Sequence, residues 1–106
     1  MKLTVLAVPD CPNLALLLRR LERVLPDARD AAPVSVRVIT SEVEAAGCGM
    51  HGSPTLLIDG QDPFATPGVA TSASCRIYRA ADGRAEGAPS IEQLRGAIHR
   101  AQQPGR

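Results

Sequence analysis

The chain has 106 residues, of which 44% are hydrophobic and 22% charged, and this is enough for one folded domain with a single core. Its 12 basic and 11 acidic residues leave a net charge of +1, so we expect neither nucleic acid nor a membrane surface as a partner. No apolar run is long enough for a secretory signal or a membrane span, which favours a cytoplasmic location.

Three elements are predicted before residue 40. Residues 3–8 form a nearly continuous apolar run, which is typical of a strand buried on both faces. Apolar residues at helical spacing then follow from Leu14 to Leu25 and predict a helix that ends near Pro26. Residues 34–39 alternate between valine and polar side chains at first, which predicts a strand with one more polar face.

A short helix and a buried strand come next. Ser41 has a glutamate three residues after it, the pattern of a capping box, and the helix that it begins should end at Gly47. Residues 55–58 form an apolar, partly β-branched run that stops at an Asp-Gly turn, so they predict a central strand.

The last two elements are a strand and a helix. Residues 75–79 alternate again and predict a strand, and Ser90 with Gln93 forms a second capping box before an amphipathic helix. Residues 104–106 should be a frayed tail beyond a single domain of residues 1–103.

The predicted order is β-α-β-α-β-β-α, which gives an α/β fold. The two apolar strands should be central and the two alternating strands should flank them. The first two strands should be parallel, and the last two are most simply antiparallel. We therefore expect a four-stranded mixed sheet in the order 2-1-3-4, with helices on both faces.

The chain has three cysteines, Cys11, Cys48 and Cys75. An odd number without a signal peptide argues for free thiols in a reducing compartment rather than for a disulfide scaffold. Cys48 and His51 could form half of a metal site, but no second Cys/His pair stands at zinc-ligand spacing, so we expect no metal and no other cofactor.

Pro54 is unusual because it stands at the entrance of a predicted central strand. Proline cannot donate to a sheet ladder, so it is tolerated only at an edge, at a bulge or at the first residue of a strand. From these residues alone, the bond between Ser53 and Pro54 could be the trans bond of an ordinary turn or a cis bond.

Two motifs resemble those of the thioredoxin-like superfamily. The stretch CPNL at residues 11–14 stands at the first strand-to-helix junction, and GSPTLL at residues 52–57 opens the third strand. Together with the stretches DPF and SCRIYR, they are similar to small bacterial thioredoxin-like proteins, some of which carry an alkylmercury-lyase-like label. This chain contains no separate lyase domain.

The resemblance implies roles for four residues. Cys11 would be the catalytic sulfur, and Pro12, Ser53 and Pro54 would bind the substrate. The bond before Pro54 would be cis, and the backbone of Ser53 would face an extended substrate beside the sulfur.

The position of Cys11 also predicts reactivity on physical grounds. Pro12 suits the first position of a helix, which places Cys11 at or beside the N-cap. Unpaired N–H groups and the helix dipole favour a thiolate there, although the neighbouring Asp10 opposes this effect. Cys11 should then be the most reactive of the three thiols; the alternative is an inert cysteine that caps the helix.

Leu14 occupies the position where a dithiol protein of this family has its second cysteine. A dithiol cycle through this motif is therefore excluded. A mixed disulfide on Cys11 would need a small thiol, a partner protein thiol, Cys48 or Cys75 to resolve it. The predicted hairpin places Cys75 at the end of the sheet away from Cys11, on the order of 15 Å distant, whereas the position of Cys48 is not fixed.

Three hypotheses for the function follow. The first is a monothiol oxidoreductase or thiol-transfer protein, with a low-molecular-weight thiol or a protein thiol as its partner. The second is binding of a soft metal such as mercury, or an accessory role in organomercurial chemistry, through two thiols. The third is an interaction module without redox activity. The loop at residues 61–74 is either anchored to an apolar surface by Phe64 or serves as a lid or a partner-binding loop.

Overall fold

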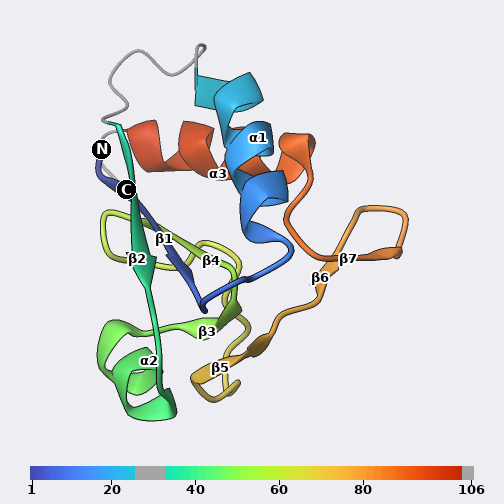
Figure 1. Ribbon diagram of the computed structural model, residues 1–106. Helices are drawn as coiled ribbons and strands as arrows, with labels where there is room; N and C mark the ends of the chain where they lie inside the picture. The colour runs from blue at the N-terminus through green and yellow to red at the C-terminus, as the bar shows by residue number, and fades with distance from the viewer. Residues whose placement is uncertain (26–32, 104–106) are drawn as a thin grey trace.

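The computed structural model describes residues 1–25 and 33–103, which form an α/β structure with three helices and a mixed sheet (Figure 1). Pro26 and the predicted tail at residues 104–106 lie outside the described residues. The elements are, in chain order, β1 (Leu3–Ala7), α1 (Leu14–Val24), β2 (Val34–Val38), α2 (Glu42–Cys48), β3 (His51–Ser53), β4 (Thr55–Ile58), β5 (Ser72–Cys75), β6 (Tyr78–Arg79), β7 (Ala85–Glu86) and α3 (Ile91–Gln102).

The main sheet has three strands in the order β2-β1-β4. β1 lies in the middle, parallel to β2 and antiparallel to β4, so that Leu3 is opposite both Val34 and Ile58. A strand that is covered on both faces needs apolar side chains on both, and β1 has this composition. The parallel pairing of the first two predicted strands is confirmed.

Two aliphatic clusters cover the two faces of this sheet. On one face, α1 and α3 pack against alternate residues of β1 and β4, among them Leu3, Val5 and Leu56. On the other face, Leu6 of β1 packs with residues in and beside α2, including Ala45 and Met50. Because neighbouring residues of a strand point to opposite faces, β1 contributes to both clusters.

The predicted fourth strand at residues 75–79 is wrong. This segment divides into the end of β5 and the start of β6, and neither joins the main sheet. β5 pairs in parallel with β3, and β6 forms a hairpin with β7. The alternating pattern gave a wrong prediction because the polar residue is buried and the apolar one is exposed. The Arg76 side chain is 10% exposed, whereas Ile77 is 67% exposed.

The predicted starts of α2 and α3 agree with the structure, whereas the predicted end of α2 does not. The Ser41 side chain accepts a hydrogen bond from the amide of Glu44, and Ser90 with Gln93 forms a complete capping box. Gly47 lies inside α2, however, and the helix runs to Cys48; Gly49 is its C-cap, and its φ of 71° suits a glycine at that position.

Candidate thiol site

A tight turn after β1 positions Cys11. The amide of Cys11 donates to the carbonyl of Val8 at 3.2 Å, and Asp10 has a φ of 59°. Proline followed by a residue with positive φ is the pattern of a type II turn, and Pro9 and Asp10 supply it. Cys11 leaves this turn half-buried.

Cys11 does not lie at the helix N-cap. α1 begins at Leu14 with Asn13 as its N-cap, so Cys11 and Pro12 precede the helix. The Leu14 amide still donates to the Cys11 carbonyl at 3.3 Å, which makes these residues a turn leading into the helix. The difference arises at Asn13, whose φ of −102° and ψ of 1° are not helical.

The N-terminus of α1 has no side-chain cap. Asn13 makes no capping hydrogen bond. Its side chain lies instead against Gly87, where a β-carbon would stand only 2.2 Å from the Asn13 side-chain amide carbon. The first amides of α1 therefore have no acceptor from their own cap, and the Cys11 turn is the segment directly before them.

The bond between Ser53 and Pro54 is cis, as predicted. Both residues are buried, and the Ser53 hydroxyl oxygen accepts a hydrogen bond from the amide of Val8 at 3.0 Å. The carbonyl of Val8 also accepts a hydrogen bond from the amide of Cys11. One residue at the end of β1 thus joins the cysteine turn to the residue that precedes the cis-proline.

The backbone of Ser53 is already paired with the chain's own β5. Its carbonyl accepts the amide of Arg76 at 3.1 Å, and Ser53 stands opposite Cys75 in the β3–β5 ladder. An extended substrate would therefore meet a Ser53 carbonyl that is engaged within the chain.

Cys75 does not lie at the end of the sheet away from Cys11. The prediction assumed an antiparallel hairpin between β4 and the following strand, but β5 runs parallel to β3 and ends beside Ser53. Cys75 is exposed at this position. Cys48 is half-buried at the end of α2 and packs against the aliphatic cluster of Leu6 and Met50.

A buried ion pair lies close to the cis-proline, because Arg76 contacts Thr55, the residue that follows Pro54. The Arg76 guanidinium and the Asp62 carboxylate are 2.6 Å apart, and their side chains are 10% and 4% exposed. Arg76 also donates to the Phe64 carbonyl at 2.9 Å and to the Thr55 hydroxyl at 3.3 Å. The sequence motifs did not predict this pair. The feature that could have indicated it is an arginine, Arg76, within a segment that alternates like a strand.

Tyr78 completes this polar cluster. Its hydroxyl donates to the carbonyl of Pro54, and the Arg76 guanidinium lies 4.5 Å from the centre of its ring. Burial raises the pKa of Tyr78 well above its usual range; the charges of Asp62 and Cys11 raise it further, while Arg76 lowers it.

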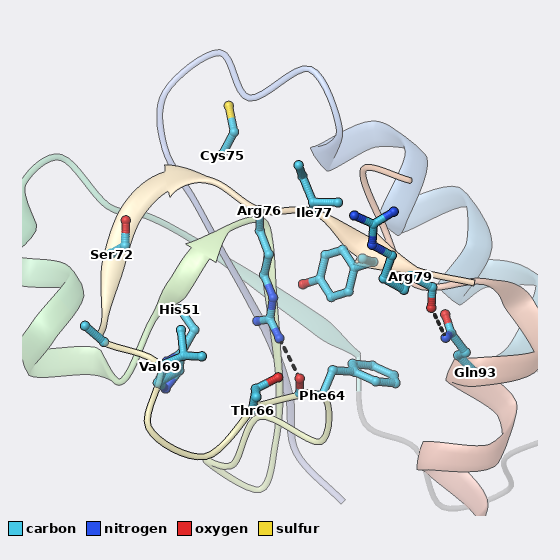
Figure 2. Close-up of a pocket in the computed structure, with 12 residues that line it drawn as sticks. His51, Phe64, Thr66, Val69, Ser72, Cys75, Arg76, Ile77, Arg79 and Gln93 are labelled. Carbon is cyan, nitrogen blue, oxygen red and sulfur yellow. Dashed lines mark hydrogen bonds between the residues drawn. The ribbon is translucent and has the colours of Figure 1, made fainter. Parts of the chain in front are cut away.

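A pocket of about 550 Å³ lies beside β5 and the residues that follow it, and Cys75, Arg76 and Ile77 all contribute to its lining (Figure 2). Part of its wall comes from the loop at residues 61–74, which Phe64 anchors by an edge-on contact with Tyr78 at 6.1 Å between ring centres. His51 also lines the pocket, and its buried Nδ1 atom has no hydrogen-bond partner within residues 1–25 and 33–103.

Comparison with protein-family models, with curated proteins and with solved structures finds no match for the chain. In the part of the chain that the structure describes, no three His, Cys, Asp or Glu side chains come together in a group that could hold a metal ion. The helices within that part are also too short or too polar to cross a membrane.

Proposed function

We propose that this chain is a thioredoxin-like protein that carries out thiol–disulfide exchange with Cys11 as the nucleophile. The observation that carries the proposal is the pair of hydrogen bonds at Val8, which joins the Cys11 turn to Ser53, the residue before the cis-proline. The Cys11 turn leads directly into α1, whose N-cap Asn13 makes no capping hydrogen bond, and a cysteine reacts as a nucleophile through its thiolate.

The proposed substrates are small disulfides and thiols, in a reducing cytoplasm. Extended peptides that bind beside a cis-proline need free backbone groups on the preceding residue, and here the Ser53 carbonyl accepts the amide of Arg76. A small disulfide needs only access to the half-buried sulfur of Cys11.

Reaction with oxidised glutathione tests this function. The Cys11 thiolate attacks one sulfur of the disulfide, the S–S bond breaks, and one glutathione thiolate leaves and takes up a proton. Peptide mapping by mass spectrometry should find the first adduct on Cys11, and Cys11→Ser should abolish it. An adduct that forms first on Cys48 or Cys75, or no adduct on any thiol, contradicts the proposal; the latter result would favour an interaction module without redox activity.

Soft-metal binding is the second candidate, and one observation favours it. Cys75 lies beside Ser53, on the side of the molecule where Cys11 is, so two thiols are available there. Two-thiolate binding of Hg(II) should require both cysteines. Titration of the Cys11→Ser and Cys75→Ser variants with Hg(II) tests this: a loss of tight binding in both supports it, and equal binding in either variant contradicts it.

A further inference from the structure

We propose that Cys75 is the resolving thiol for Cys11, so that the two cysteines form an intramolecular disulfide during exchange. This inference rests on the proposed function of Cys11 and deepens it. In the motif at residues 11–14, Leu14 occupies the position of the second cysteine. Cys75, from a distant part of the sequence, would supply the second thiol in its place.

The first support is the position of β5. Among the residues that the structure describes, β3 pairs with β5 alone, and in that ladder Cys75 is the partner of Ser53. β5 also approaches very closely at this point, because a β-carbon on Gly52 would come within 2.7 Å of the Arg76 β-carbon. The backbone next to Ser53, where the resemblance places a substrate, therefore holds the segment that carries Cys75.

The second support is the direction of the Cys75 side chain. Residues opposite each other in a ladder place their side chains on the same face. The Ser53 side chain points to the end of β1, where its oxygen accepts the amide of Val8. Cys75 therefore faces the side on which the Val8–Cys11 turn lies.

The neighbours of Cys75 in β5 agree with this direction. Ala73, which also belongs to β5, packs against the aliphatic cluster that Val8 and Cys48 contact, although the β3–β5 register shifts between Ser72 and Cys75. Arg76 points the other way, toward Asp62. Figure 2 shows the Cys75 and Arg76 side chains on opposite sides of the strand.

Cys48 is less well placed for this role. It precedes β3 and so lies toward His51, at the start of that strand, whereas Ser53 is at its end. The ladder pairs His51 with Ser72 and Ser53 with Cys75, so the end of β3 next to Val8 belongs to Cys75.

The reaction sequence balances with a small disulfide as the oxidant. Cys11 first forms a mixed disulfide and releases one small thiol. The Cys75 thiolate then attacks the Cys11 sulfur, the mixed disulfide bond breaks, and the second small thiol leaves with a proton. One disulfide is reduced to two thiols, and the two protein thiols become one disulfide.

Oxidised glutathione and four forms of the full chain test the proposal: wild type, Cys48→Ser, Cys75→Ser and Cys11→Ser. Thiols are trapped with N-ethylmaleimide, the products are mapped by mass spectrometry, and the glutathione released is counted. Trypsin leaves Cys48 and Cys75 on one peptide, since no Lys or Arg lies between Arg37 and Arg76, so the Cys48→Ser form gives the unambiguous map.

We expect wild type and Cys48→Ser to form a Cys11–Cys75 disulfide and to release two equivalents of glutathione. Cys75→Ser should stop at the Cys11 adduct and release the second equivalent at least about tenfold more slowly, because an intramolecular step becomes an intermolecular one. The rate of the second release in wild type should not depend on protein concentration.

The results that would overturn the role of Cys75 differ from those that would overturn the role of Cys11 as the nucleophile. A stable glutathione adduct on Cys11 in wild type, or a Cys11–Cys48 link, overturns the role of Cys75 and leaves the reactivity of Cys11 intact. The absence of any reaction at Cys11 in wild type overturns both. Unchanged thermal unfolding of the Cys75→Ser variant serves as the control that its fold is retained.

Discussion

Arg76 is the residue that ties β5 and the loop at residues 61–74 to the cis-proline segment. It contacts Asp62 and Phe64 in the loop, Thr55 in β4, and the ring of Tyr78. Its backbone amide also donates a hydrogen bond to the Ser53 carbonyl. A buried guanidinium is stable only when its donors find acceptors, so this one side chain fixes the relative positions of several segments.

Asp62→Ala should destabilise the protein strongly. The substitution leaves the Arg76 guanidinium buried without its carboxylate, and breaking a buried pair in this way costs about 3 kcal/mol or more. The free energy of unfolding, measured with urea, checks this. Asp82→Ala is the matched control, because its pair with Arg84 is exposed and worth less than about 1 kcal/mol; equal losses in the two variants would contradict the assigned role.

Tyr78 should make the protein less stable at high pH. Burial raises the pKa of its phenol in the folded state above the value of about 10 expected for the unfolded chain. The stabilisation that this difference represents is complete below pH of about 10 and is lost as the pH rises above it. The free energy of unfolding measured in this range should fall more steeply for wild type than for Tyr78→Phe.

Tyr78 is the only tyrosine and the chain has no tryptophan, so the ultraviolet absorbance of the phenolate reports this residue alone. Titration of the folded protein should show a midpoint clearly above that of the protein in urea. Coincident midpoints would mean that the phenol is not buried behind Pro54.

At the scale of elements, the close contact of β3 with β5 depends on Gly52. This residue has a φ of 109°, which other residues rarely adopt, and a β-carbon there would come too close to the backbone and β-carbon of Arg76. The ladder that places Cys75 beside Ser53 therefore requires a glycine at the entrance to the cis-proline.

Gly52→Ala should destabilise the protein by about 2 kcal/mol or more and slow the formation of the Cys11–Cys75 disulfide. Gly47→Ala provides the control, because Gly47 lies inside α2 with open space around it, and alanine should stabilise a helix there by about 0.5–1 kcal/mol. Urea unfolding measures both. A harmless Gly52→Ala variant that forms the disulfide at the normal rate would argue against the tight β3–β5 contact.

Local signals predicted the elements whose neighbours along the chain determine them. The continuous apolar run of β1 identified a central strand, and the serine caps at Ser41 and Ser90 identified two helix starts. Pro54 was recognised because a proline has few permitted places in a strand. These features depend on a few adjacent residues, and the sequence displays them directly.

Pairing between distant segments could not be predicted in the same way. The alternation at residues 75–79 suggested a strand beside β4, but a buried ion pair with Asp62 turns Arg76 inward and breaks the strand. The residues next to an arginine do not predict which carboxylate will form an ion pair with it. The predicted position of Cys75 was wrong for this reason. The cis bond between Ser53 and Pro54 is confirmed, whereas the roles of Cys11, Pro12, Ser53 and Pro54 stay predictions.

At the scale of the whole molecule, the candidate site is assembled from three separate parts of the chain. The sheet brings the end of β1 to Ser53, β5 lies along β3, and α1 begins directly after the Cys11 turn (Figure 1). The two core clusters hold this arrangement from both faces of the sheet. The account therefore expects the chemistry to concentrate at the one thiol that this assembly places before a helix.

The relative alkylation rates of the three thiols test this central claim most directly. The folded wild-type protein is treated with a limiting amount of iodoacetamide at neutral pH, and mass spectrometry measures the rate at each cysteine, with unfolded protein as the reference. We predict that Cys11 reacts fastest in the folded state and faster than it does in urea, because its turn leads directly into the start of α1, which has no side-chain cap. A faster reaction at Cys48 or Cys75, or a Cys11 rate that rises on unfolding, would contradict it.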